Sequence, residues 1–353
     1  MVKHCTIDCE RRDRHAVCLM PMSDSNEVPW WYLDFAFPDS TGIFSYSDWS
    51  RHRSWLRFWW EPGTFLRALG NMLPILVWVT LVTICMTLYY ELGQMQHEGW
   101  VVLVSKDYNQ PFILTSFALA LLLVFRTNSS YERWWSARKH FGQMYNDARS
   151  LARFTMVWIA PKEPVVAARM MRFLSVLGPA SCSYMMEDGM RIFDSLVGCT
   201  LVDKEYDAIK QSEQPPITIL MLLSHWMKET SCLQTFERIT MEERLVSYQI
   251  ELGCLERIKN QPIYTPYTRQ TSRFLLIYLT FLPFSLIAYL SWASIGVMPM
   301  LVFLLVGIDN IGIRAENPMT TLPIKALAAS SKNTVEVIWR TYDSMYYKNI
   351  ISS

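Results

Sequence analysis

The sequence predicts an all-α membrane protein with four transmembrane helices and a helical domain on the water side of the membrane. Three observations support this prediction: long stretches without charge, an abrupt junction at Arg126, and a polar middle region with helical periodicity. Hydrophobic residues make up 51% of the 353 residues and aromatic residues 14%, and the mean hydropathy is +0.11. These values allow a membrane protein with a substantial soluble part.

Two uncharged stretches near the start of the chain predict the first two transmembrane helices. Ala68–Tyr90 is long enough to cross about 30 Å of hydrocarbon, and Pro74 lies in its first turns, where a kink is tolerated. The shorter stretch Tyr108–Phe125 ends at Arg126, which is followed by the hydroxyl and amide side chains of Thr127–Ser130. A helix with this pattern leaves hydrocarbon for a polar surface.

A third uncharged stretch, Phe274–Ile308, is too long for one span and suits two short ones. Its middle, Ser291–Pro299, contains the Gly and Pro of a tight turn, so spans three and four are predicted to form a helical hairpin.

The segments before the first span are polar, then basic and aromatic. Residues 1–50 are predicted to form a mobile N-terminal arm. Arg51–Arg67 combines arginine with tryptophan and suits the headgroup level, with an ordinary packing helix as the alternative. This segment and the first two spans form the unit 51–127.

Positive residues flank the spans on one side only, whereas the short connectors between paired spans carry almost none. Both termini and the middle region are therefore predicted to face the cytosol or the stroma. The units are a water-side helical domain at 128–272, spans three and four at 273–312, and a C-terminal tail at 313–353. The sequence does not decide between a plasma membrane and a plastid thylakoid membrane as the location.

The middle region is expected to be helical. Apolar residues recur at three-to-four spacing after Trp134, and Pro161 and Pro164 break this helix. Pro215 and Pro216 begin a long amphipathic stretch that ends near Ile258.

Composition and motifs argue against several classes of function. A net charge of +1 gives no reason to expect nucleic acid, and no hydrolase, metalloprotease or nucleotide-binding motif indicates an enzyme. The eight cysteines lack paired spacing, which indicates reduced thiols, and the grouping of Cys5, Cys9 and Cys18 with two histidines matches no structural zinc pattern. No metal or cofactor is expected. Asp309 and Glu316 flank the end of span four and lack a third partner for catalysis.

Two motifs resemble one family. Phe117–Gly142, with the core FRTNSSYERWW that includes Phe125, Arg126, Asn128 and Tyr131, closely resembles the segment after the second span in the bestrophin-like family. Gly307–Pro323 is similar to the exit from span four in that family, and it includes Asn317 and Pro318. The likeness covers roughly residues 50–330. It implies a homopentameric, passive chloride channel of the plant and bacterial voltage-dependent type, which could also pass nitrate or bicarbonate.

In such a pentamer, the resemblance implies that the second span of each subunit lines a narrow neck. One stripe at four-residue spacing would face the pore: Gln110, Leu114, Ala118 and Leu122. The neighbouring stripe of Phe117, Leu121 and Phe125 would then pack outward or between subunits. Any of these side chains could instead face lipid or pack between helices.

Anion preference would come from helix N-termini and from arginine. Pro111 fits the first turn of a helix whose N-terminus marks the pore entrance. Arg126, Arg133 and Arg138 could concentrate anions in a vestibule, or they could serve as interfacial anchors and intersubunit ion pairs.

Two features qualify the resemblance. Animal bestrophins carry a calcium-binding acidic run after Asn-Pro, whereas Met319–Pro323 has no acid, so calcium activation is not expected. No span carries a regular array of arginine or lysine, so a voltage sensor of that kind is not expected either. A non-conducting membrane scaffold and a coupled anion transporter remain the alternative functions.

Overall fold

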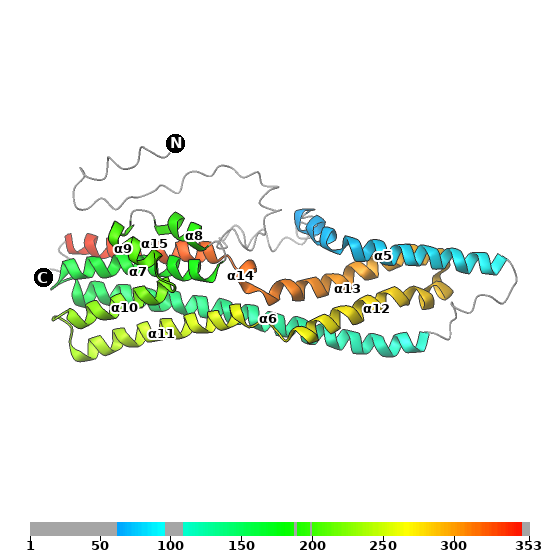
Figure 1. Cartoon of the computed structure of the whole chain (residues 1–353), viewed down its shortest axis with the longest axis horizontal. Coiled ribbons are helices and arrows are strands. Elements are labelled where there is room, and N and C mark those ends of the chain that lie inside the picture. The colour runs from blue at the N-terminus through cyan, green and yellow to red at the C-terminus, as the bar shows by residue number, and fades with distance from the viewer. Residues whose placement is uncertain (1–61, 96–108, 187–188, 198–199, 348–353) are drawn as a thin grey trace, which may run out of the picture.

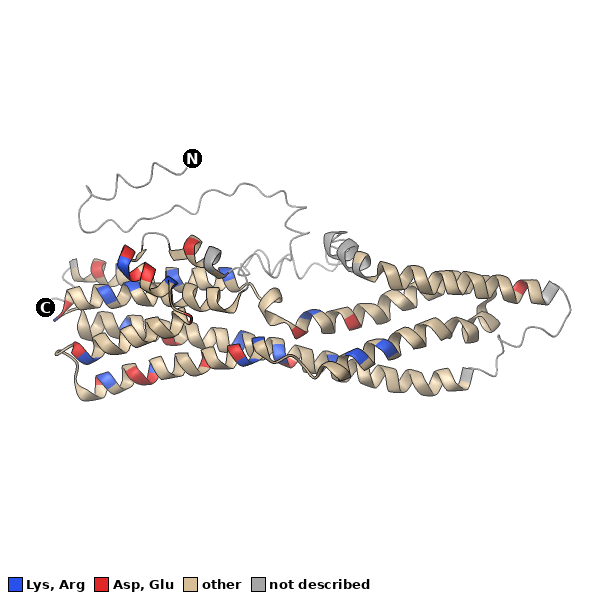
Figure 2. Cartoon of the chain, in the orientation of Figure 1, with Lys and Arg blue, Asp and Glu red and all other residues tan. Residues whose placement is uncertain are grey.

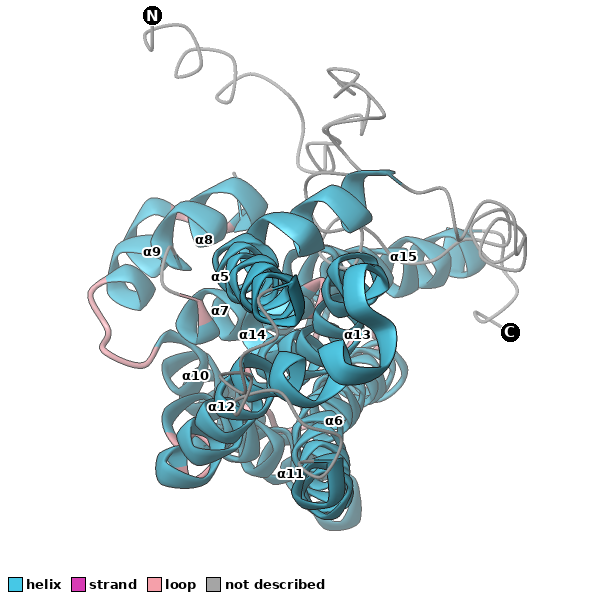
Figure 3. Cartoon of the chain, turned by 90° about the vertical axis from the view of Figure 1, so that its right-hand side faces the viewer, coloured by secondary structure: helices cyan, strands magenta, loops and turns pink. Residues whose placement is uncertain are grey.

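The computed structural model describes residues 62–95, 109–186, 189–197 and 200–347, and every regular element in these ranges is a helix. The helices separate into two regions along the long axis (Figure 1), and the view from the membrane end shows the same all-helical architecture (Figure 3). The predicted arm and Arg51–Glu61 lie outside the described residues. We call the two regions the membrane region and the helical domain.

The membrane region consists of four long helices, of which α6 contributes only its first half: α5 (Pro62–Met95), α6 (Asn109–Phe154), α12 (Thr265–Leu290) and α13 (Ser294–Glu316). Its hydrophobic core draws on all four: Met72, Val79, Leu119, Leu123, Leu275, Leu279, Met298, Val302 and Val306. Its outer surface is also apolar, with Trp78, Phe117 and Phe281 more than half exposed. Lys and Arg gather in the helical domain and at the end of the membrane helices that meets it (Figure 2).

Length and composition identify four stretches of the described chain that could cross a membrane: Met72–Gly93, Gln110–Ile159, Pro164–Met185 and Thr265–Glu316. The last stretch contains both α12 and α13 and so provides two spans. Pro164–Met185 is α7, and 72% of its apolar window is buried, which identifies it as the core helix of the helical domain. The predicted spans are thus α5, the first half of α6, α12 and α13, and the chain is an integral, multi-pass membrane protein.

The hairpin of α12 and α13 is present, but its turn is shorter than predicted. The chain reverses at Ser291–Ala293, where Ser291 has a φ of 47°, and Gly296 and Pro299 already belong to α13. The Ser291 hydroxyl donates a hydrogen bond to Glu91 of α5. Polar contacts between helix ends, rather than glycine or proline, therefore close this turn.

Helix α6 belongs to both regions. It runs without a break from Asn109 to Phe154, which corresponds to about 69 Å at 1.5 Å per residue. Arg126 therefore marks a change of surroundings within a continuous helix. A π-helix at Thr155–Ile159 follows directly, and the chain then leaves the helix at Pro161.

The helical domain is built around α7 (Pro164–Met185), which packs against α15, α8 and α10, while α11 packs against α6. The remaining bounds are α8 at Gly189–Val197, α9 at Asp203–Lys210, α10 at Pro215–Glu229 and α11 at Thr235–Asn260. The amphipathic stretch from Pro215 therefore forms two helices. The backbone N–H of Gln234 donates to Glu237 at 2.9 Å and starts the second of them.

The predicted C-terminal tail is mostly folded. After α14 (Pro318–Thr321), α15 (Ile324–Tyr347) packs along α7 and α6. Its apolar residues join the core of the helical domain through Ile324, Ala328 and Val335. This helix is therefore an integral part of the domain.

Candidate pore segment and its anchoring network

The predicted pore residues lie on the part of α6 that crosses the membrane region. Gln110, Leu114 and Ala118 are exposed in the single chain, with Leu114 at 75%. Leu122 is half-buried, and its carbonyl oxygen accepts a hydrogen bond of 3.3 Å from the hydroxyl of Tyr267. Each step of four residues advances about 40° around an α-helix. The predicted stripe therefore turns from the open face toward the helix bundle at Leu122.

The neighbouring stripe stays on the open face throughout. Phe117, Leu121 and Phe125 are 74%, 45% and 55% exposed. They lie away from Leu119 and Leu123, which α6 buries in the core of the membrane region. Parts of both stripes thus belong to the face of α6 that the other membrane helices leave uncovered.

Pro111 lies in the first turn of α6, where proline is well tolerated. The helix begins at Asn109, so Pro111 lies in the first turn, where its missing N–H has no intrahelical partner to lose. The Thr115 hydroxyl donates to the Pro111 carbonyl at 2.7 Å, within the same helix. This end of α6 leaves its first backbone N–H groups without intrahelical acceptors.

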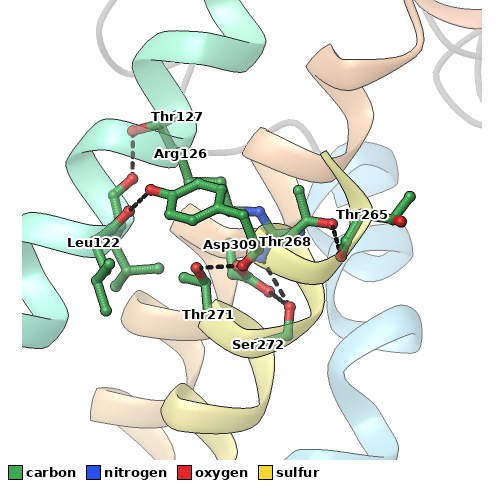
Figure 4. Close-up of polar contacts among 10 residues, drawn as sticks. Leu122, Arg126, Thr127, Thr265, Thr268, Thr271, Ser272 and Asp309 are labelled. Carbon is green, nitrogen blue, oxygen red and sulfur yellow. Dashed lines mark hydrogen bonds and ion pairs between the residues drawn. The ribbon is translucent and has the colours of Figure 1, made fainter. Parts of the chain in front are cut away.

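A buried charged pair anchors α6 at the inner end of the membrane region (Figure 4). Arg126 of α6 is 4% exposed and forms an ion pair with Asp309 of α13. Ser272 of α12 joins them: Arg126 donates to its hydroxyl oxygen at 2.8 Å, and the hydroxyl donates to Asp309 Oδ2 at 3.2 Å. Three membrane helices are therefore tied together at one level.

This network neutralises the charge of Arg126 locally. A buried carboxylate 183 residues away in sequence is its partner, while Arg126 Nε has no hydrogen-bond partner in the described part of the chain. Removing one member of such a buried pair typically costs about 3–5 kcal/mol because the other charge is left uncompensated. The arrangement fixes the position of α6 at the boundary between the two regions.

The other two predicted arginines have different surroundings. Arg133 is half-buried and donates to three backbone carbonyls, those of Ile258, Gln261 at 2.5 Å and Glu316 at 2.8 Å. It thereby holds the ends of α11 and α13 against α6. Arg138 is exposed and has no ion pair or hydrogen bond to the described residues. Among the three, Arg138 is thus the one that presents its charge to solvent.

The remaining motif residues have distinct structural positions. Asn128 is exposed, and Tyr131 stacks on Trp134 with ring centroids 6.1 Å apart. Asn317 caps α14: its side-chain oxygen accepts from the backbone N–H of Met319 at 3.2 Å. Pro318 is buried at the first position of α14, so the Asn-Pro pair turns the chain from α13 toward α15.

The described residues contain no group of three His, Cys, Asp or Glu side chains arranged for a metal ion. Cys85, Cys182, Cys232 and Cys254 are free thiols. The N-terminal cysteines and their neighbouring histidines lie outside the described residues.

The sequence places Arg126 and Asp309 at the ends of two spans but does not predict that they pair. A usable signal was present, because each charge closes a long uncharged stretch. Charged residues at such depths are usually paired with one another.

Comparison with known proteins agrees with this architecture. The family model described as "Bacterial/Fungal Bestrophin protein" matches residues 48–337. A voltage-dependent anion channel-forming protein of Synechocystis sp. is 27% identical, over 79% of this chain and 91% of its own length. Voltage-dependent chloride channel 2, chloroplastic, of Arabidopsis thaliana is 26% identical, over 81% of this chain and 70% of its own.

The solved structures give the same result for the fold. A bacterial bestrophin homolog from Klebsiella pneumoniae has a TM-score of 0.66 and 21% identity to this chain, and the match covers 75% of this chain and 97% of that structure. The apolar four-span bundle, the long shared helix α6 and the family match over most of the sequence lead to one assignment: the chain belongs to the bestrophin family.

Proposed function

We propose that this chain is the subunit of an anion channel whose pore is lined by α6. The observation that supports it is the uncovered face of α6, which continues from Gln110 through the membrane region to Asn128. The relatives named as anion and chloride channels support anions as the substrate class. We propose chloride as the first candidate and nitrate or bicarbonate as the next. An ion channel, rather than an enzyme, is the class of protein that these relatives favour.

A single α6 helix cannot enclose a passage, so several copies must surround a common axis. We propose a homopentamer, as the family resemblance implies. The helical domain offers a second contact surface for such an assembly, a groove of about 500 Å³ along α11. Its apolar residues Ile239, Val246 and Ile250 are 53%, 48% and 59% exposed in the single chain. A neighbouring subunit would remove this apolar surface from water.

Within the uncovered face, the line that faces the axis is proposed to run through Gln110, Leu114, Phe117 and Leu121. These residues lie opposite the buried side of α6, whereas Ala118 and Leu122 approach its packed edge. An apolar ring at this line gates by dewetting when it is narrow. This proposal shifts the predicted stripe by one position at its inner half.

The electrostatic contribution is proposed to come from the N-terminal turn of α6 at Pro111 and from Arg138. Arg126 and Arg133 act in this proposal as anchors, because Arg126 pairs with Asp309 and Arg133 donates to helix carbonyls. Calcium activation is not part of the proposal, because Met319–Pro323 supplies no carboxylate.

Orientation follows from charge. We propose that the helical domain faces the cytosol or the stroma, because positive residues lie where the membrane helices meet it (Figure 2). Either a plasma membrane or a thylakoid membrane suits this orientation.

Current measurements on the purified protein in planar bilayers test the function. An anion gradient should shift the reversal potential toward the anion equilibrium potential, and substitution of chloride by nitrate should change the conductance. Silence under every ion and voltage would support a scaffold, and saturating flux tied to a second ion would support a coupled transporter. A particle mass of five subunits tests the assembly.

Single-cysteine variants test the pore line with a charged thiol reagent. Phe117→Cys and Leu121→Cys should lose current on modification, whereas Ala118→Cys and Leu122→Cys should respond weakly. The reverse pattern would restore the stripe predicted from the sequence. In that case Ala118→Phe should reduce conductance by narrowing the neck, and Leu114→Ala should ease wetting in either arrangement.

A further inference from the structure

A small cavity lies between α6 and α15 in the helical domain, far from the candidate pore segment. Its volume is about 50 Å³, and its lining comes from α6 and α15: Tyr145, Arg149, Leu327, Ser330, Ser331, Thr334 and Val335. One water needs about 10–15 Å³ of such volume, so the cavity holds roughly three or four water-sized groups. Arg149 is about 42 Å along the helix from Leu121. None of the lining residues is acidic.

Four of the polar side chains around this cavity, those of Tyr145, Arg149, Ser330 and Ser331, have no partner among the described residues. Ser331 is only 7% exposed, yet its hydroxyl forms no hydrogen bond to the described residues. The hydroxyls of the partly exposed Tyr145 and Ser330 also form no hydrogen bond to the described residues, and Arg149, which is exposed at the mouth of the cavity, forms neither a hydrogen bond nor an ion pair there. Because buried polar groups are nearly always hydrogen-bonded, the Ser331 hydroxyl needs a partner from outside the described chain, either water or a small solute in the cavity.

Helix α7 makes room for the buried hydroxyl. Gly178 of α7 lies beside Ser331, and a Cβ atom added to it would come within 3.0 Å of Ser331 Oγ. A larger residue at 178 would therefore displace the hydroxyl. The glycine keeps Ser331 at the cavity wall.

The positive charge and the hydroxyl donors of the lining residues favour an anion as the ligand. Arg149 supplies a permanent positive charge, and the three hydroxyls supply donors. The Thr334 hydroxyl already donates to the Ser330 carbonyl at 2.8 Å. A cation would meet no carboxylate and one like charge, and a divalent anion would retain an uncompensated charge beside a single arginine.

We propose that this cavity binds one small monovalent anion, such as chloride or nitrate, between the Arg149 guanidinium and the hydroxyls of Tyr145, Ser330 and Ser331. Bound anion connects α15 to α6 through groups that otherwise have no partner. Because the ligand binds the folded state, it raises the stability of the protein. The site lies outside the proposed pore and does not depend on conduction.

Bromide is a suitable probe because its anomalous scattering locates it directly. Crystals of the full chain grown in bromide should show an anomalous peak at hydrogen-bonding distance from Arg149 and Ser331. Arg149→Gln should abolish this peak, and Ser331→Ala should weaken it. Arg153→Gln is the matched control: Arg153 lies one turn further along α6, over the Phe154 ring at 4.6 Å, and does not line the cavity.

A solution measurement provides the second readout. The Tm of the wild-type protein should rise as chloride replaces gluconate at constant ionic strength, and the dependence specific to this site should be lost in Arg149→Gln but kept in Arg153→Gln. The absence of a bromide peak, or equal chloride dependence in both variants, would show that the cavity holds only water. Failure of conduction in bilayers would leave these outcomes unchanged, so the two proposals are tested separately.

Discussion

The membrane region and the helical domain are both made of helices, but their polar side chains have different partners. In the helical domain polar groups bridge helices: Ser247 donates to Asp147 at 2.7 Å, and His140 contacts Glu251 at 2.5 Å, both between α6 and α11. Along the membrane spans, Thr83 donates to the carbonyl of Val79 in its own helix at 2.7 Å, whereas the hydroxyl contacts between membrane helices lie near helix ends, as for Ser272 and Ser291. Hydroxyl groups satisfied within one helix suit a region where water is absent.

The surfaces differ more than the cores. Both regions have a hydrophobic core, but exposed apolar side chains occur along α5, α6, α12 and α13 of the membrane region, whereas in the helical domain they include the groove along α11. The surroundings, lipid or water, therefore determine which residues occur on the outer surface of each region, while the buried residues are mainly apolar in both. The buried pair of Arg126 and Asp309 lies where these two conditions meet.

The largest expected effect concerns that boundary. Asp309→Ala leaves Arg126 buried without its counter-charge, so we expect a loss of about 3–5 kcal/mol in the free energy of unfolding. Denaturant unfolding of the detergent-purified protein measures it. Asp207→Ala, at an exposed position on α9, serves as the control and should change stability by less than about 0.5 kcal/mol. Equal stability of the two variants would contradict the anchoring role.

The next effect compares two exposed apolar residues. Phe281, 51% exposed in the membrane region, should tolerate Asp poorly, with an insertion cost of about 3 kcal/mol. Val165 is 75% exposed in the first turn of α7, where Val165→Asp should be neutral or slightly stabilising because a carboxylate there suits the helix dipole. The fraction of protein that resists alkaline extraction from membranes reports the first effect, and Tm reports the second. Similar behaviour of both variants would remove the distinction between the two surfaces.

A smaller effect comes from deleting one hydroxyl in each region. Tyr248 is fully buried in the helical domain and is hydrogen-bonded to Ser181 at 2.8 Å; burial raises the pKa of Tyr248, so the phenol stays neutral. Tyr248→Phe should cost about 1–2 kcal/mol, because it removes the partner of a buried hydroxyl. Tyr267→Phe loses a single bond of 3.3 Å to Leu122 and should cost about 0.5 kcal/mol. Thermal unfolding of both variants gives the order, and the reverse order would be inconsistent with these contacts.

The smallest effect is on thiol reactivity in single-cysteine variants. Burial raises the pKa of Cys232, as does the nearby Glu163 carboxylate, so a charged maleimide should label it slowly at neutral pH and faster as pH rises. Cys85 is exposed on α5, but lipid or a neighbouring subunit should cover it and prevent labelling in liposomes. Labelling rates across a pH series provide the measurement. Rapid labelling of Cys85 by the charged reagent would place it in contact with water.

The sequence was most informative where a pattern is local. Absence of charge located all four spans, and proline located the starts of α7 and α10. The observed turn at Ser291–Ala293 lies within the predicted Ser291–Pro299 but is shorter, because Gly296 and Pro299 belong to α13 and the Ser291 hydroxyl contacts Glu91 of α5. Contacts between distant segments have no comparable local pattern.

The absence of a local pattern also explains why the sequence does not predict the partners of Arg126 and Arg133 or the packing of helix α15. The partner of Arg126 is 183 residues away, and three-dimensional packing alone brings the two together. The donors of Arg133 are occupied by carbonyls at the ends of two other helices, which residue type does not reveal. Ile324, Ala328 and Val335 have helical spacing, but their burial depends on α7.

The unbroken course of α6 has a mechanical consequence. Helix α6 is continuous across the membrane boundary, so a rotation of its membrane half about the Arg126–Asp309 pair also moves its water-side half. Arg149 lies about 35 Å from Arg126 along the helix, so a tilt of α6 by about 5° about that point displaces Arg149 by about 3 Å. Displacements of side-chain size at the water-side end therefore correspond to rotations of only a few degrees among the lipid-facing turns.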